Sequence, residues 1–134
     1  RYTEDYLDIE GEAWITRADE NLECVKVAKG NKVYKAIDGV LYLKNTKQLE
    51  YYPPAKKGSY EIIEGTKYVN DAAFIYTKYL TSLTVPDSVK SIIISPRDSK
   101  SLKQLTVSIK CEVIKMTKRE SGGVKVYRRL VLKC

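Results

Sequence analysis

A short apolar pattern of the form L-x-x-[LV]-x-V recurs three times, and it constrains the fold of this 134-residue chain more than any other feature. Its copies begin at Leu22, Leu80 and Leu102, and a partial fourth copy ends in Tyr60-Glu61-Ile62. The last apolar position falls at 27, 62, 85 and 107, so the steps are 35, 23 and 22 residues. Self-similarity at a nearly fixed period of this size is typical of proteins built from stacked repeats.

The last two apolar residues of each copy alternate with polar ones, as in a β-strand with one buried face. One such strand cannot bury its apolar side alone, so successive repeats must stack. We therefore predict parallel strands near 24–27, 60–63, 82–85 and 104–107, in one solenoid. The predicted core comprises Leu22, Val25, Val27, Ile62, Val69, Phe74, Leu80, Leu83, Val85, Leu102, Leu105 and Val107.

The segments between these strands contain further elements. Asp71-Ala-Ala-Phe74 follows one strand and predicts a short helical turn. The 35-residue step exceeds one repeat by about a dozen residues. Its extra residues hold two alternating runs around Asn45-Thr46, which predict an inserted β-hairpin over 39–52. An insert can also serve as a binding loop.

The C-terminal segment shows two strand-like runs around Gly122-Gly123, a pair suited to a two-residue hairpin turn. We predict a hairpin over 111–133 that caps the last unpaired strand edge of the stack. In that hairpin Cys111 and Cys134 would face each other at a hydrogen-bonded pair, where side chains stand far apart. We therefore expect no disulfide between them.

Composition limits the chemistry. The chain has no His, which excludes His-dependent catalysis and His-containing metal sites. The third cysteine, Cys24, is far from the other two in the sequence, so no Cys-x-x-Cys metal or redox pair exists. We expect no enzyme activity, no cofactor and no metal. No apolar stretch approaches the roughly 18 residues of a membrane helix, so we expect no transmembrane segment.

Several stretches resemble the BspA-like, treponemal-type leucine-rich repeat proteins: Asp38-Gly-Val-Leu-Tyr42, Tyr51-Tyr-Pro-Pro54, Gly58-Ser-Tyr60 and Thr81-Ser-Leu-Thr-Val-Pro-Asp-Ser-Val89. The resemblance covers roughly residues 9–107. It implies a right-handed leucine-rich repeat solenoid, mostly β with short helical turns. It also implies a bacterial protein, secreted or on the cell surface, with any leader outside this chain, and a role in adhesion to host proteins or other cells.

Together, the repeats and the resemblance predict one domain over 1–134. It divides into an N-terminal repeat (1–27), an inserted hairpin (28–58), further repeats (59–109) and a C-terminal hairpin cap (110–134). The predicted function is non-catalytic binding of a surface protein or glycan by a monomer. Two alternatives stay open: a purely structural spacer, and a basic binder of anionic glycan or nucleic acid, since the net charge is +7.

Nucleic acid is the less favoured partner, because only Tyr127 could stack on a base in the basic C-terminal segment. The basic residues there alternate with apolar ones, as on a solvated sheet face. For a macromolecular ligand, the outward side chains of the four predicted strands form the candidate binding strip, about 15 Å wide. These side chains are Cys24, Lys26, Glu61, Ser82, Thr84, Gln104 and Thr106.

Overall fold

The computed structural model describes residues 4–7, 21–27, 30–44, 47–74, 77–94, 101–115 and 124–129, with the backbone alone at 4–7, 94 and 115. These residues form β-strands and turns and contain no helix. The strands are β1 (Glu4–Leu7), β2 (Cys24–Val27), β3 (Tyr34–Ile37), β4 (Val40–Leu43), β5 (Gln48–Tyr51), β6 (Gly58–Glu61), β7 (Tyr68–Val69), β8 (Leu80–Thr84), β9 (Ser91–Ile94), β10 (Gln104–Ser108), β11 (Glu112–Lys115) and β12 (Lys125–Arg129).

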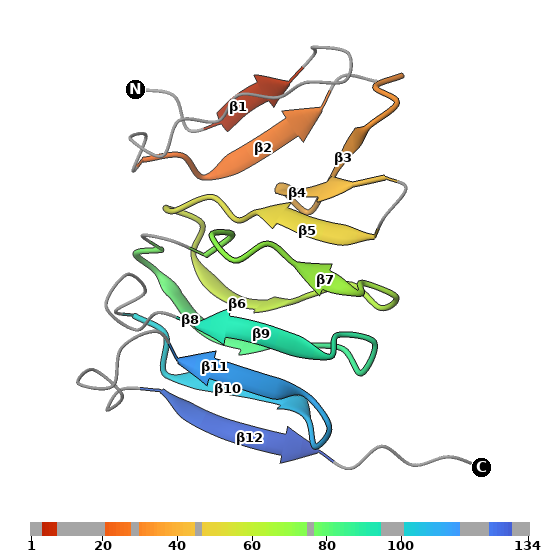
Figure 1. The fold of residues 1–134 in the computed structure, drawn as a ribbon. Coiled ribbons are helices and arrows are strands. Elements are labelled where there is room, and N and C mark those ends of the chain that lie inside the picture. The colour runs from red at the N-terminus through yellow and green to blue at the C-terminus, as the bar shows by residue number, and fades with distance from the viewer. Residues whose placement is uncertain are drawn as a thin grey trace.

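The chain is a β-solenoid whose rungs stack from the N-terminal strands at the top of Figure 1 to β12 at the bottom. One sheet contains β6, β8, β10 and β12, all parallel. In it Gln104 lies beside Ser82 and Lys125, which are 22 residues before and 21 residues after it. The repeat period in the sequence is therefore the rung-to-rung step of the solenoid.

Each rung turns a corner and supplies a strand to a second face. The corners after β6, β8 and β10 are built alike, with an N–H bonded to the carbonyl three residues earlier: Thr66 to Ile63 (3.2 Å), Val89 to Pro86 (3.1 Å) and Cys111 to Ser108 (3.0 Å). On the second face β9 and β11 pair in parallel, and β7 pairs with β5. The predicted helical turn at 71–74 is a turn closed by a bond from Ala73 N to Asn70 O (2.9 Å).

The predicted inserted hairpin is confirmed, with β4 antiparallel to β5. The structure adds a strand that the prediction lacked, because β3 is antiparallel to β4. The two join at Asp38-Gly39, where φ is 54° and 79°. Positive φ at both central residues is the type I′ turn that Asp-Gly favours. The Asp-Gly pair was therefore the signal for β3.

The predicted core is confirmed: all its members are buried except Val27 and Val69, which are half-buried and pack against it. An aromatic cluster joins the insert to the repeats. The Tyr52 ring lies 5.3 Å from that of Tyr60 and 5.1 Å from that of Phe74. The Tyr42 and Tyr60 hydroxyl groups share a hydrogen bond of 2.5 Å. The insert is thus an integral part of the core.

The predicted C-terminal hairpin over 111–133 is wrong. β11 pairs with β9 and β12 pairs with β10, both in parallel, so the repeat continues beyond 110. The reason is the phase of the repeat. In this register β12 places Val126 beside Leu105 and keeps the Val126 side chain on the core side. The prediction that Cys111 and Cys134 face each other depended on that hairpin and therefore has no support. Cys111 is a buried free thiol, and Cys134 lies outside the described residues.

Two strand predictions also need correction. The strand over 24–27 exists, but it pairs with β1 and does not join the sheet of β6, β8 and β10. Backbone groups of the insert region form hydrogen bonds with this segment instead. Val25 N, on the strand, donates to Gly39 O (2.9 Å), and Ala55 N donates to Leu22 O (2.8 Å), just before the strand. The strand predicted at 60–63 is β6, which begins two residues earlier, at Gly58.

Candidate ligand-binding surfaces

Alternate residues of β6, β8, β10 and β12 face away from the core. They stand in two rows across the sheet: Ser59, Ser82, Gln104 and Lys125 in one, and Glu61, Thr84, Thr106 and Tyr127 in the other. The residues between them, such as Leu83 and Leu105, are buried. We call this surface of eight side chains the ladder face. It is about 15 Å wide, because neighbouring strands lie about 4.8 Å apart.

The ladder face holds five of the predicted binding residues: Glu61, Ser82, Thr84, Gln104 and Thr106. The other two, Cys24 and Lys26, lie on β2 in a different sheet. Cys24 is half-buried and packs against the Asp38-Gly39 turn, where a Cβ on Gly39 would lie 3.2 Å from its Sγ atom. Lys26 is exposed. The structure therefore does not place these two residues on the predicted strip.

Small side chains leave two shallow hollows on the ladder face. One, of about 560 Å³, is lined by Glu61, Thr84, Thr106 and Arg129, among others. The other, of about 440 Å³, lies beside it and includes Ser59 and Ser82. Hydroxyl and carboxylate groups in these hollows can accept hydrogen bonds, and the hydroxyl groups can also donate them. A ligand could thus approach the strands closely.

Charge is unequally distributed around the ladder face. Acidic side chains lie near β6, where Glu61 is exposed and Asp38 contacts Lys56 at 3.7 Å. Basic side chains lie on β12. Its Arg129 donates from Nε to Asp87 Oδ1 at 2.9 Å and also donates to the carbonyl of Val85, which joins the last described rung to the corner after β8. A ligand along the strip would meet an acidic end and a basic end.

Sequence reasoning missed part of the ladder face. Ser59 was missed because the predicted strand began at 60, and Lys125 and Tyr127 were missed because their segment was assigned to a hairpin. A signal was present in Val124-Lys125-Val126, which keeps apolar alternation one repeat after Leu105. The Gly-Gly pair before it outweighed that signal, because such a pair is typical of a two-residue hairpin turn.

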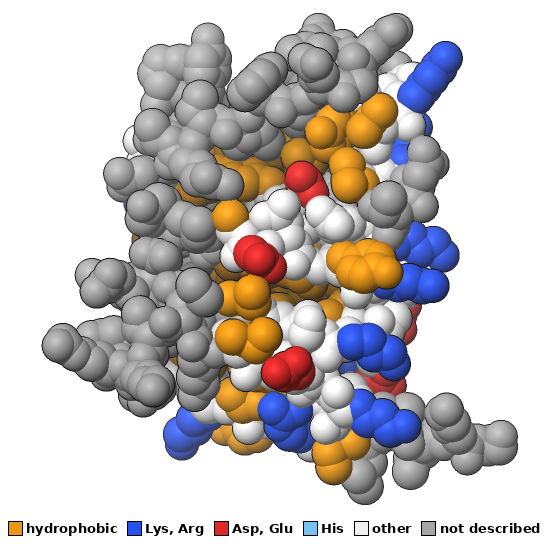
Figure 2. All heavy atoms as spheres, in the orientation of Figure 1, with side chains coloured by type: hydrophobic (Ala, Val, Ile, Leu, Met, Phe, Trp, Pro, Cys, Tyr) orange, Lys and Arg blue, Asp and Glu red, His pale blue; other side chains and the backbone are white. Residues whose placement is uncertain are grey.

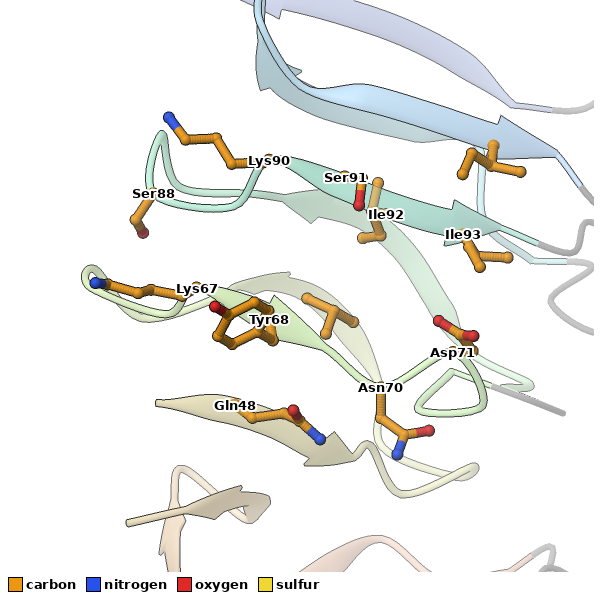
Figure 3. A pocket seen from close by; sticks show the side chains of 12 residues that line it. Gln48, Lys67, Tyr68, Asn70, Asp71, Ser88, Lys90, Ser91, Ile92 and Ile93 are labelled. Atoms are coloured by element: carbon orange, nitrogen blue, oxygen red, sulfur yellow. The ribbon is translucent and has the colours of Figure 1, made fainter. Parts of the chain in front are cut away.

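A second surface lies on the second face of the solenoid, as an open groove of about 860 Å³ between β7 of the β3-β4-β5-β7 sheet and β9 of the β9-β11 pair (Figure 3). Within the described ranges, β7 pairs with β5 and β9 pairs with β11, but no ladder of hydrogen bonds joins β7 to β9. The aromatic side chain of Tyr68, 59% exposed, lies in the groove, with Lys67 and Lys90 at one end. Nothing in the sequence pattern predicted this groove.

The reactive groups in the described part of the chain are few. Burial raises the pKa of the Cys111 thiol, despite the opposing charges of Arg128 and Arg129, so the thiol stays protonated and unreactive at neutral pH. The described residues hold no group of three potential metal ligands. None of their segments forms a helix long and apolar enough to cross a membrane.

The fold is similar to those of two crystal structures of bacterial proteins. A leucine-rich repeat protein from Eubacterium ventriosum aligns with a TM-score of 0.73 and 26% identity over 96% of this chain. The pneumococcal vaccine antigen PcpA aligns with a TM-score of 0.54 and 14% identity over 98% of it, a likeness of fold alone. The chain spans 37% and 56% of those two chains. No family model and no curated protein matches the sequence. Leucine-rich repeat folds of this kind are typically non-catalytic repeat modules.

Proposed function

We propose that this chain is a non-catalytic, extracellular binding module of BspA-like type, which recognises a surface protein or glycan through the ladder face and contributes to adhesion. The observation that carries the proposal is the pair of in-register polar rows on β6, β8, β10 and β12. The regular stacking of the strands makes this surface rigid, and the small side chains on it leave the strands accessible to a ligand. A rigid, pre-formed site loses little conformational entropy on binding.

The dimensions support an extended ligand. A strip about 15 Å wide fits a peptide segment, a loop or a few sugar units better than a broad protein face. The acidic and basic ends favour a ligand whose charges run in the opposite order along the strip. One strip of this size supports weak binding, which would be strengthened where several copies act together on a cell surface.

The test replaces two side chains in one row of the ladder face, Ser82→Arg with Gln104→Arg. Wild-type protein is first measured by surface plasmon resonance against a panel of purified extracellular-matrix proteins and bacterial cell-wall glycans. For each binder found, we expect the double variant to lose at least tenfold in affinity, because two long charged side chains obstruct the strip. The melting temperature should be unchanged, since both side chains face away from the core.

The control is Glu23→Lys, an exposed residue that belongs neither to the ladder face nor to the groove; this change also raises the net charge by two. The control should bind as wild type does. Equal loss in both variants would indicate a general charge effect, and no loss in either would exclude the ladder face.

A second candidate function is that of a spacer, in which the rungs only extend a longer solenoid. The observation in its favour is that the chain spans 37% of the Eubacterium ventriosum protein. A spacer predicts that no member of the panel binds, and that substitutions on the ladder face change neither stability nor cell attachment of the full-length protein.

A further inference from the structure

Three lysines stand in a row where β5, β7 and β9 begin. Lys67 N donates to Lys47 O at 3.0 Å, so these two residues lie on neighbouring rungs, about 4.8 Å apart. The hydroxyl group of Ser88 donates to Thr66 O at 2.5 Å and ties the turn before Lys90 to the turn before Lys67. All three lysines are exposed, and Figure 2 shows Lys and Arg side chains along this edge, at the right of the view.

These lysines have no acidic partner within the described part of the chain. Neither Lys47, Lys67 nor Lys90 lies within 4.0 Å of a described carboxylate, whereas Lys56 and Arg129 do form ion pairs. Like charges on neighbouring strands repel each other and lower stability. A bound anion would remove that repulsion, so the row is suited to a ligand with several negative charges.

The groove beside the row adds a different chemistry. Tyr68 exposes its ring at the middle of the groove, and the polar side chains of Gln48, Asn70 and Ser91 lie around it (Figure 3). An exposed ring offers a flat apolar surface, and amide and hydroxyl groups can both donate and accept hydrogen bonds. Sugar rings have matching features, with apolar faces and hydroxyl groups at their edges.

We propose that this groove and its lysine row bind an acidic polysaccharide, with a sugar ring on Tyr68 and carboxylate or sulfate groups against Lys47, Lys67 and Lys90. The site lies on a different sheet from the ladder face, so either proposal can fail without the other. A single-stranded nucleic acid fits less well. Such sites use several stacking aromatics, whereas the lining of this groove contains one aromatic side chain, Tyr68.

The test measures binding of the purified protein to immobilised heparin, a sulfated polysaccharide, at low ionic strength. Lys67→Gln with Lys90→Gln keeps most of each side chain and removes two charges. We expect its affinity to fall about three- to tenfold, as for the loss of two exposed ion pairs. Tyr68→Ala should reduce affinity about three- to tenfold as well, and its effect should persist at a salt concentration that screens the lysines.

The control is Lys57→Gln with Lys103→Gln, two exposed lysines that lie just before β6 and β10 and belong neither to the groove nor to the ladder face. This variant loses the same charge and should bind heparin as wild type does. Neutral dextran should not bind, and oligo-dT should compete only weakly. The proposal is overturned if wild type does not bind heparin, if the control loses as much affinity as the groove variant, if Tyr68→Ala has no effect, or if oligo-dT binds more tightly than heparin.

Discussion

At the scale of single residues, Gly39 shows how one position connects the insert to the first rungs. Its φ of 79° lies in the left-handed region, which residues other than glycine enter at a cost of about 1–2 kcal/mol. Its neighbour Asp38 tolerates the same region, because short polar side chains adopt it more readily than others do. A Cβ at Gly39 would also meet Cys24 Sγ at 3.2 Å, so both the turn and the packing require glycine.

We predict that Gly39→Ala lowers the free energy of unfolding by about 1–3 kcal/mol, the sum of backbone strain and the contact with Cys24. Gly65→Ala is the matched control: φ there is 90°, but a Cβ meets nothing within 4 Å, so only the strain remains. Denaturant unfolding of both variants measures the difference. Adding Cys24→Ala to Gly39→Ala should restore part of the loss. An equal effect of the two glycine variants would contradict a role for the Cys24 contact.

The same scale explains why core residues were predicted well and binding residues less well. Apolar periodicity predicts buried residues such as Leu83 and Leu105, because the fold needs an apolar side chain at each of these positions. The residues that form one outward-facing surface can be predicted only after the register between the strands is known. Cys24 and Lys26 had the right phase for the strip, yet the insert separates their strand from β6, and no local pattern reveals that separation.

At the scale of elements, the insert is held to the repeats by tyrosine side chains. The hydroxyl group of Tyr42, on β4, shares a hydrogen bond with Tyr60, on β6, and accepts one from Ile63 N at 3.4 Å. Burial raises the pKa of Tyr42, Tyr52 and Tyr60 above the ordinary value of 10. Each of the three therefore keeps its proton in the folded chain at a pH where the unfolded chain has lost it.

This gives a prediction with a definite sign. The stability linked to these protons is fully present below pH 10 and is lost as the pH rises further, because only the unfolded state ionises there. The free energy of unfolding should fall above about pH 10 by about 1.4 kcal/mol per pH unit for each tyrosine, or about 4 kcal/mol per unit for the three. Urea unfolding at several pH values measures the slope.

A pair of variants isolates the source of that slope. Tyr60→Phe removes one buried hydroxyl group and should reduce the slope by about one third. Tyr68→Phe changes an exposed tyrosine and should leave the slope as it is. If Tyr60→Phe leaves the alkaline slope unchanged, the tyrosine cluster does not keep its protons as we describe.

Elements also show where sequence reasoning failed. The hairpin at 39–52 was found because its alternation and turn lie close together in the chain, and the strand β3 was missed although Asp38-Gly39 marks its turn. The C-terminal strands were found as strands but given the wrong partners. Alternation defines a strand and its buried side, whereas its partner depends on contacts with residues about 20 positions away, which only the repeat phase reveals.

At the scale of the whole molecule, stacked rungs produce two different surfaces from one repeat. The corner turns at 63–66, 86–89 and 108–111 fix where each rung leaves one sheet and enters the other. Hydroxyl-rich positions then line the ladder face, and lysines precede the strands β5, β7 and β9 on the second face of the solenoid. The ladder face depends on one claim, that the parallel stack continues in register from β6 to β12.

The most direct test of this claim is to measure nuclear Overhauser contacts between backbone protons of the isotopically labelled protein. The account predicts contacts between Leu105 and Val126 and between Thr106 and Tyr127, the in-register partners of β10 and β12. It also predicts parallel contacts between β9 and β11, such as Ile92 with Val113. Antiparallel contacts between the 112–115 and 125–129 segments, with none from Leu105 to Val126, would contradict the continued solenoid and with it the four-stranded ladder face.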